Sequence, residues 1–87
     1  MGSPRRSGRY ELLLARLVEA RRESDLSQAE VARRLGRPQS FVSKYERAER
    51  RLDVVELIDV CEALGVAPEE IVAELASVGR SRRSHGS

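Results

Sequence analysis

Aromatic residues and cysteine are scarce in this sequence of 87 residues. It has no tryptophan, one phenylalanine and two tyrosines. The single cysteine, Cys61, excludes an intramolecular disulfide, and with the single histidine, His85, it is too little for a structural zinc site. Leucine, valine, alanine, arginine and glutamate dominate instead, and this composition favours short helices over a β-sheet. We therefore expect an all-α protein that binds neither a metal nor another cofactor.

Long apolar runs are also missing. No stretch approaches the roughly 20 apolar residues that cross a bilayer, and the N-terminus lacks the apolar segment of a secretory signal peptide. We therefore expect a cytoplasmic protein that has no membrane partner, where a lone cysteine stays reduced. A chain of this length holds one domain with a modest core, so self-association would add to its stability.

Groups that could carry out catalysis are few and scattered. His85 lies close to the C-terminus, and Cys61 takes an inward helical position that suits a small apolar side chain. The acidic residues Glu56, Asp59 and Glu62 spread around an exposed helix face rather than converging on one point. These positions predict that the protein is not an enzyme and has no metal site.

The net charge of +2 hides a strong division along the chain. Residues 1–22 carry six arginines against two acids, and residues 37–51 carry five basic residues against two acids; residues 52–76 carry seven acids and no basic residue. A basic side suits a polyanion such as DNA, and an acidic far side discourages binding in the wrong orientation. The terminal arginines could equally be solvated tails, but residues 37–51 lie inside the predicted fold.

Local signals in the first half of the chain predict three helices. Apolar residues at helical spacing predict a helix over 10–23. Ser27, with Glu30 three residues later, forms a capping box that begins a second helix, and Gly36 ends it. The proline that follows suits the first turn of a third helix, which we expect over about 38–47.

The second half repeats these signals and contains no strand that the pattern supports. Asp53 caps a fourth helix, which Gly65 ends. Pro68 opens a short last helix that we expect to reach about Leu75. Asp25, between the first two helices, suits a turn because aspartate tolerates left-handed backbone angles.

The predicted domain therefore covers residues 10–76. Arginine, serine and glycine dominate the sequence on either side of it. We expect residues 1–9 to be a flexible basic arm and residues 77–87 to be a flexible basic tail.

The predicted third helix has two distinct faces when successive residues are placed about 100° apart. Val42 and Tyr45 point inward, and the outward strip is a continuous row of hydrogen-bonding side chains: Gln39, Ser40, Ser43 and Lys44. Glutamine matches adenine, lysine donates to guanine, and serine bonds a base edge or a phosphate. Most exposed helix faces are polar, but this strip lacks the paired glutamate and lysine residues of an ordinary solvated face. It predicts base contacts in a DNA major groove.

The chain resembles the lambda-repressor-like helix-turn-helix domains, also called the Cro/C1 or XRE type, in three stretches at fixed spacings: "LSQAEVARRLG", "RPQSFVSKYERAER" and "LDVVELIDVCEALGV". The resemblance covers about residues 10–76. It implies a compact all-α domain of five helices, in which the third helix enters the major groove and the second lies across the DNA backbone. Domains of this family usually bind inverted repeats as dimers.

The resemblance also implies roles for single residues. Gln28 would bind a phosphate and brace Gln39. Base edges would be read by Gln39, Ser40 and Lys44, with Ser43 beside them. The two helix starts attract phosphates because a helix N-terminus carries about half a positive charge. We expect the DNA backbone to be contacted by a larger set: Ser27, Gln28, Arg37, Phe41, Arg47, Arg50 and Arg51.

Three further positions have alternatives that the sequence leaves open. Phe41 lies between the inward and outward faces, so it could cover a thymine methyl or a sugar, or form the edge of the core. The resemblance implies an ion pair between Arg21 and Glu46, and the alternative is two exposed charges that contribute little. Ala48 stands where the family commonly has glycine, and alanine disfavours positive φ, so we expect the third helix to run longer.

These features predict a sequence-specific regulator of transcription that binds double-stranded DNA, acts as a repressor and is associated with the nucleoid. We expect a homodimer that associates through the last helix, although its residues could instead fill the monomer core: Ile71, Val72 and Leu75. The alternative function is a protein-interaction module, such as an antitoxin or co-regulator, that uses the acidic fourth and fifth helices.

Overall fold

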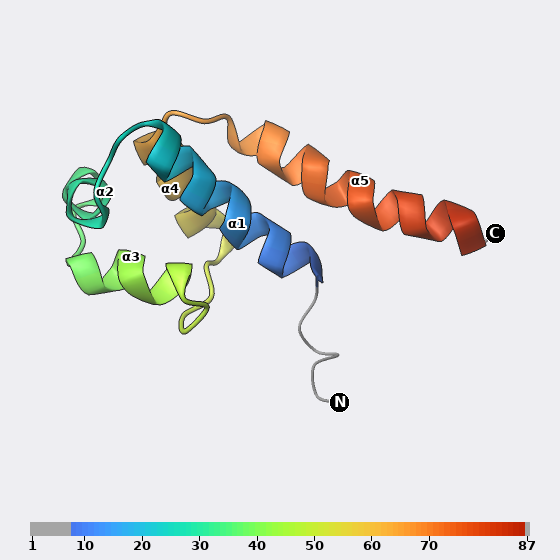
Figure 1. Ribbon diagram of the computed structural model, residues 1–87, viewed down its shortest axis with the longest axis horizontal. Coiled ribbons are helices and arrows are strands. Elements are labelled where there is room, and N and C mark those ends of the chain that lie inside the picture. The colour runs from blue at the N-terminus through green and yellow to red at the C-terminus, as the bar shows by residue number, and fades with distance from the viewer. Residues whose placement is uncertain (1–7, 87) are drawn as a thin grey trace.

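The computed structural model describes residues 8–86, with side chains to Val78, and these residues form five α-helices and no strand. In chain order the helices are α1 (Gly8–Glu23), α2 (Gln28–Leu35), α3 (Gln39–Glu46), α4 (Val54–Leu64) and α5 (Pro68–Gly86). The prediction of an all-α fold of five helices is confirmed. Short turns bring α2, α3 and α4 around the C-terminal half of α1, and α5 extends beyond them (Figure 1).

Two capping boxes begin α2 and α4. The Ser27 hydroxyl accepts a hydrogen bond from the Glu30 amide at 3.0 Å, and the Glu30 carboxylate accepts one from the Ser27 amide at 2.8 Å. Asp53 and Glu56 make the same reciprocal pair at 2.7 and 3.0 Å. Each N-cap side chain contributes about 1 kcal/mol to helix stability, so these four residues fix where the two helices begin.

Left-handed residues end the helices and confirm most of the predicted turns. Gly36 has φ 68° and Gly65 has φ 77°, and Asp25 in the first turn has φ 60°. At Gly36, where the chain turns from α2 to α3, the amide bonds Arg33 O at 3.1 Å. Because glycine adopts this conformation without strain, the turn between α2 and α3 can be this short.

The end of α3 corrects a prediction. We expected Ala48 to avoid positive φ and lengthen the helix, but α3 ends at Glu46 and Ala48 adopts φ 64°. Two hydrogen bonds close the turn, from the Ala48 amide to Tyr45 O at 3.1 Å and from the Glu49 amide to Lys44 O at 2.8 Å. These bonds satisfy carbonyls at the helix end, which offsets a strain of about 1–2 kcal/mol for a left-handed alanine.

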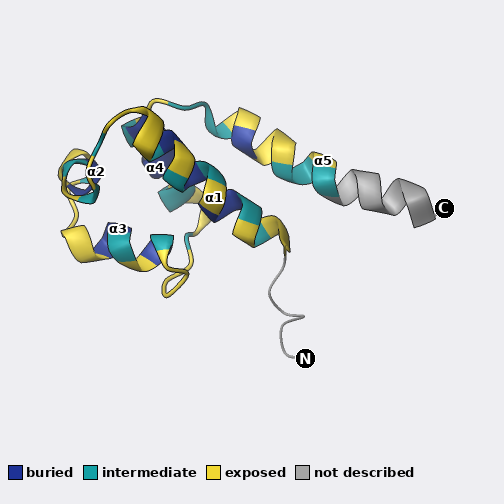
Figure 2. Ribbon diagram, viewed as in Figure 1, coloured by how far each residue is buried: buried dark blue, intermediate teal, exposed yellow. Residues whose placement is uncertain are grey.

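The core lies where α1, α2, α3 and α4 meet, and the start of α5 closes it with Ile71 (Figure 2). Tyr45 and Val42 from α3 are fully buried, as predicted, and Leu17 of α1 is fully buried with them. The rings of Tyr45 and Phe41 pack edge to face, with centroids 5.6 Å apart. Each large side chain of this kind contributes about 1.5–3 kcal/mol when buried. The inward residues therefore hold α3 firmly on the body of the domain.

The first and last helices are longer than predicted. α1 begins at Gly8, so Gly8 and Arg9 belong to the helix rather than to the arm, and α5 continues to Gly86 instead of ending near Leu75. The apolar pattern marks where the buried face of a helix ends, but backbone hydrogen bonds continue until a residue breaks the helix. Residues 1–7 of the predicted arm and residue 87 of the predicted tail lie outside the described residues, and the division of the chain at 10–76 stays a prediction.

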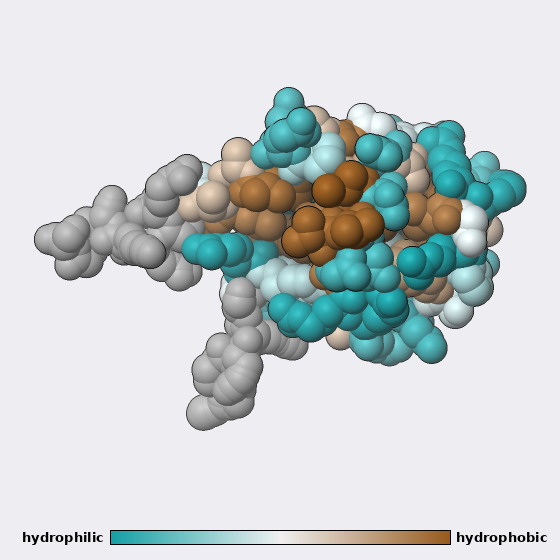
Figure 3. Space-filling view, turned by 180° about the vertical axis from the view of Figure 1, so that it is seen from behind, coloured by the Kyte–Doolittle hydropathy of each residue, from teal (hydrophilic) through white to brown (hydrophobic). Residues whose placement is uncertain are grey.

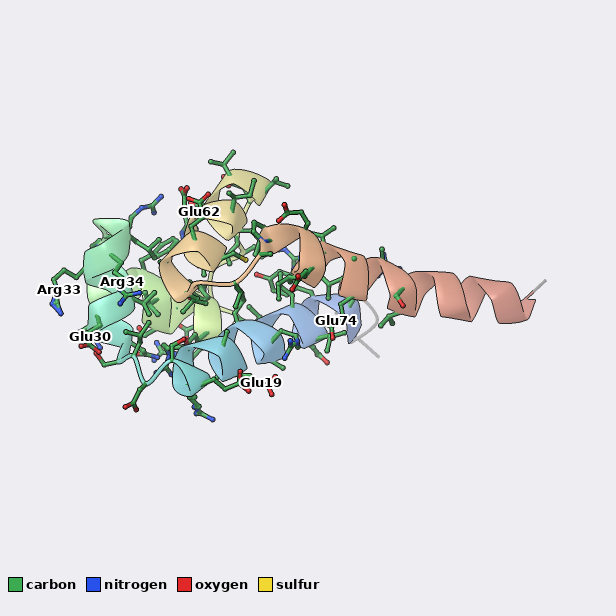
Figure 4. The ribbon with its side chains drawn as sticks, turned by 90° about the horizontal axis from the view of Figure 1, so that it is seen from above. Glu19, Glu30, Arg33, Arg34, Glu62 and Glu74 are labelled. Atoms are coloured by element: carbon green, nitrogen blue, oxygen red, sulfur yellow. The ribbon has the colours of Figure 1, made fainter. Side chains whose placement is uncertain are left out.

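One charged contact ties α5 to α1. Arg16 on α1 pairs with Glu74 on α5 at 3.1 Å and also with Glu19. Figure 4 shows Glu74 beside the N-terminal part of α1. Both pairs are exposed to solvent, so their contribution to stability is small.

Candidate nucleic-acid interface

The outward face of α3 carries the polar strip that the sequence predicted. Gln39, Ser40 and Lys44 are exposed and Ser43 is half-buried. Ser43 also donates a long hydrogen bond to Ser40 O at 3.4 Å within the helix. The two predicted faces of α3 are therefore confirmed, and four hydrogen-bonding side chains share the solvent side of one short helix.

The N-termini of α2 and α3 differ in how they are capped. Pro38 at the start of α3 provides no side-chain cap, so the positive end of that helix is open to an anion. At α2 the Glu30 carboxylate already bonds the Ser27 amide. The Ser27 hydroxyl oxygen accepts a hydrogen bond from the Glu30 amide. The hydroxyl hydrogen of Ser27 can still be donated to a phosphate. Of the two predicted phosphate sites, the start of α3 therefore has fewer of its backbone amides bonded to the protein's own side chains.

An ion pair between α1 and α3 fixes the orientation of α3. Arg21 donates to both carboxylate oxygens of Glu46, from Nε at 2.7 Å and from Nη2 at 3.1 Å. The side chains of Arg21 and Glu46 are only 13% and 7% exposed. Hydrogen bonding to Glu46 raises the pKa of Arg21 above its ordinary value. The ion pair that the resemblance implied is thus formed, and it is not a pair of loose surface charges.

Gln28 joins this pair and corrects a second prediction. Its Nε2 donates to Glu46 Oε1 at 2.9 Å, so Gln28 braces Glu46 rather than Gln39. Arg21 also donates to Leu26 O at 3.0 Å, in the turn before α2. A carboxylate at the end of α3 attracts the Gln28 amide more strongly than the neutral side chain of Gln39 does. One carboxylate consequently links α1, α2 and α3.

A cluster of arginine side chains lies around Phe41 at the other edge of α3. The guanidinium carbons of Arg37 and Arg50 lie 4.3 and 4.9 Å from the centre of the Phe41 ring. The ring itself is only 7% exposed. The burial of Phe41 supports the alternative in which it forms the core edge, and two arginines cover its ring; its contact with the DNA backbone stays a prediction.

Glu56 is the residue of this cluster that the sequence prediction missed. Its carboxylate accepts two hydrogen bonds from Arg50, both at 2.9 Å, and approaches Arg37 Nη2 at 3.5 Å. The Arg50 bonds, with the bond from the Asp53 amide, lower the pKa of Glu56 to about 2. Glu56 stands three residues after Asp53, the same spacing as Ser27 and Glu30. The sequence therefore contained a signal that the Glu56 carboxylate is held in a capping box.

The two remaining predicted backbone contacts are exposed arginines. Arg47 pairs with Glu49 at 3.1 Å, where both side chains are more than half exposed, and this bond raises the pKa of Arg47. Arg51 lies over the Tyr10 ring, with its guanidinium carbon 4.1 Å from the ring centre. Exposed contacts of this kind contribute little and exchange easily. Both arginines can therefore turn toward a phosphate at low cost.

A separate part of the surface has an apolar face between α4 and α5. Figure 3 shows apolar residues gathered on this side of the molecule. Val54 is 70% exposed and Val72 is 49% exposed. They line a groove of about 570 Å³ together with Leu57, Ile58, Glu62, Pro68 and Glu69.

The residues predicted for the dimer interface divide between this face and the core. Ile71 is only 4% exposed and belongs to the core, so its place in the predicted interface is wrong. It turns inward because successive residues on a helix point about 100° apart, which leaves Val72 on the outer side. Leu75 is half-buried and packs against the core.

Within the part of the chain that the structure describes, no helix is long and apolar enough to cross a membrane. No group of three or more histidine, cysteine or acidic residues there could hold a metal ion.

A pair of helices joined by a tight turn, with three further helices packed around it, defines the class: this is a helix-turn-helix protein. A family model described as Helix-turn-helix matches residues 17–71. The chain is 37% identical over 62 residues to an uncharacterized HTH-type transcriptional regulator, y4dJ, of Sinorhizobium fredii, a match that spans 71% of this chain and 80% of that protein.

A solved structure is also similar. The XRE-family like protein from Pseudomonas syringae pv. tomato is 51% identical, with a TM-score of 0.79, over 82% of this chain and 87% of that one. The chain therefore belongs to the XRE-type, or Cro/C1-type, helix-turn-helix family of transcriptional regulators.

Proposed function

We propose that this protein is a sequence-specific regulator that binds double-stranded DNA with α3 in the major groove. The observation that carries the proposal is the division of α3 into two faces. Phe41, Val42 and Tyr45 hold the helix on the core. The other side is left to hydrogen-bonding groups that match base edges: Gln39, Ser40, Ser43 and Lys44.

Each of these side chains has a distinct task in the proposed complex. Gln39 presents a donor and an acceptor to adenine, and Lys44 donates to guanine, with about 1–3 kcal/mol of discrimination for each well-formed bidentate contact. Ser40 and Ser43 bond a base edge or a phosphate. Such discrimination requires a helix that does not tilt, and the contacts of Arg21 and Gln28 with Glu46 supply that constraint.

The DNA backbone supplies the rest of the binding energy. Phosphates approach the open N-terminus of α3 and the Ser27 hydroxyl at the start of α2. The second amide hydrogen of Gln28 can bond a phosphate while the first bonds Glu46. Neutralising charge comes from Arg37, Arg47, Arg50 and Arg51. Affinity should fall steeply as salt rises, because each phosphate contact releases counterions.

We further propose that the protein acts as a homodimer on an inverted repeat, as a repressor that occupies DNA in the cytoplasm, at the nucleoid. Half-sites should lie about one helical turn apart, since a dimer presents two copies of α3 to one side of the duplex. Val54, Ile58 and Val72 form the dimer surface in this proposal, in place of the buried Ile71. A dimer bound to the major groove of DNA represses transcription by excluding other proteins from the same DNA.

Selection of bound sequences from a pool of random duplexes tests this function. We expect an enriched motif at moderate salt, with two related halves. The variant Gln39→Ala with Lys44→Ala should enrich no motif, while Glu70→Gln, exposed on α5 outside the groove, should enrich the same motif as the natural chain. Failure of the natural chain to enrich any motif would contradict the proposal.

The groove between α4 and α5 favours a second candidate, a protein-interaction module such as an antitoxin or co-regulator. Exposed Val54 and Val72 would anchor a partner, and Glu62 and Glu69 at the groove would attract its basic residues. This candidate predicts that Gln39→Ala with Lys44→Ala leaves the cellular function intact. It also predicts that Val72→Asp abolishes that function.

A further inference from the structure

We propose that Glu56 is an internal counter-charge that competes with DNA phosphates for Arg37 and Arg50, and so limits how strongly the protein binds the DNA backbone. The inference rests on the proposed function, because it concerns the same DNA-binding side of the domain. It assigns a specific task to a residue that lies on α4 and not on the recognition helix.

The geometry begins with where the two arginines lie in the chain. Arg37 precedes α3 and Arg50 follows it, yet both guanidinium groups lie over the ring of Phe41. Both are also within 3.5 Å of one carboxylate, that of Glu56. The loop after α3 therefore folds back toward the start of the helix, which is the end with no side-chain cap.

Exposure separates the carboxylate from the arginines. The side chains of Arg37 and Arg50 are 40% and 41% exposed, while that of Glu56 is 13% exposed. Incoming DNA can thus reach both cations without touching the anion. Both guanidinium groups contact this one carboxylate, with the Asp53 carboxylate a weaker influence on Arg50, and their exposed sides remain open to a phosphate.

Glu56 stays in place when the arginines turn toward DNA. Its carboxylate also accepts a hydrogen bond from the Asp53 amide at 3.0 Å, as part of the capping box that begins α4. Arg50 uses both terminal nitrogens on this fixed carboxylate, in the two-pronged geometry that it would use on a phosphate. A phosphate that takes Arg50 in that geometry must displace Glu56. The low pKa of Glu56 keeps it charged at neutral pH, so the competition persists there.

The test compares Glu56→Gln with Glu70→Gln. Both variants remove one negative charge from the acidic helices, but Glu70 is exposed on α5 outside the groove, and no contact of Glu70 with an arginine of the cluster is present among the described residues. Glutamine at position 56 can still accept the Asp53 amide, so the capping box is kept. The probe is a duplex of arbitrary sequence, titrated at several salt concentrations. Melting curves of the variants confirm that they are folded.

We expect Glu56→Gln to bind this duplex more tightly than Glu70→Gln does. One additional phosphate contact should steepen the dependence of log K on log salt by about 0.9, which corresponds to roughly eightfold tighter binding near 0.1 M salt. Equal salt dependence in the two variants would overturn the proposal, because net charge alone would then account for any gain. Weaker binding by Glu56→Gln would also overturn it, since Glu56 would then hold the arginines in their binding positions.

A double-mutant cycle with Arg50→Ala gives an independent measurement. Arg50→Ala should weaken binding little when Glu56 is present and about eightfold when residue 56 is glutamine. Equal losses in the two backgrounds would contradict the proposal. Failure of the proposed function has a different signature, since a chain that enriches no motif from random duplexes still binds arbitrary DNA through its arginines.

Discussion

Replacing Glu46 with alanine should weaken the fold more than the loss of any other charged side chain at the DNA-binding side. The Glu46 carboxylate accepts three hydrogen bonds, two from Arg21 and one from Gln28, at 2.7, 3.1 and 2.9 Å. Glu46→Ala removes all three and leaves the Arg21 guanidinium mostly buried without a counter-charge. The free energy of unfolding therefore falls both through the lost bonds and through the stranded charge.

The magnitude follows from how far the pair is buried. Removing one partner of a fully buried pair costs about 3–5 kcal/mol, and an exposed pair contributes about 0–1 kcal/mol. Arg21 and Glu46 are 13% and 7% exposed, which is closer to the buried case. We expect a loss of about 2–3 kcal/mol, since some solvent still screens the pair. For a domain of this size that loss lowers the melting temperature by roughly 10–20 °C.

Thermal melting followed by circular dichroism measures this effect against a matched control. Glu49→Ala removes a glutamate three residues away, whose pair with Arg47 is exposed, and should change stability by less than about 0.5 kcal/mol. The double variant Arg21→Met with Glu46→Leu should recover much of the loss because no charge is stranded. Equal melting temperatures for Glu46→Ala and Glu49→Ala would refute the reasoning.

Three further predictions follow from other parts of the structure. Ala48→Gly should raise the free energy of unfolding by about 0.5–1 kcal/mol, measured by urea unfolding, because glycine adopts φ 64° without strain; an unchanged midpoint would contradict this. The stability that Glu56 contributes should be present above pH 4.5 and be lost as the pH falls toward 2, because the folded state lowers the pKa of Glu56 from 4.5 to about 2. Between these values the unfolded chain binds a proton that the folded chain does not. Acid unfolding followed by circular dichroism should therefore depend less on pH in Glu56→Gln, and equal pH dependence would contradict this. Val72→Asp should give a folded monomer by sedimentation, whereas Ile71→Ala should lose about 2–5 kcal/mol of stability; a dimer that survives Val72→Asp would contradict the proposed interface.

Much of the fold could be predicted because its boundaries depend on neighbouring residues. The capping box at Ser27 and the left-handed glycines at positions 36 and 65 require only a few residues of sequence. Ala48 shows the limit of such rules, since bonds to Lys44 O and Tyr45 O outweigh the intrinsic preference of alanine. The end of α5 was missed because the apolar pattern reports burial and not the extent of the backbone helix.

The candidate site was harder to predict where contacts join distant segments. The two faces of α3 follow from helical periodicity, so its outward strip was correctly placed. The partner of Gln28 depends on the position of Glu46, 18 residues away, and the role of Glu56 depends on a loop that folds back to the start of α3. Ile71 and Val72 differ in burial only because of how α5 rotates against the core, which no local pattern specifies.

The specificity ratio of the protein and its α3 variant tests the central claim most directly. The measurement is the affinity for a selected duplex divided by the affinity for a scrambled duplex of the same length, at one salt concentration. We expect Gln39→Ala with Lys44→Ala to reduce this ratio by at least tenfold, from a loss of about 1–3 kcal/mol per base contact, because affinity for the scrambled duplex loses only the charge of Lys44. A ratio that the variant preserves would contradict base recognition by α3.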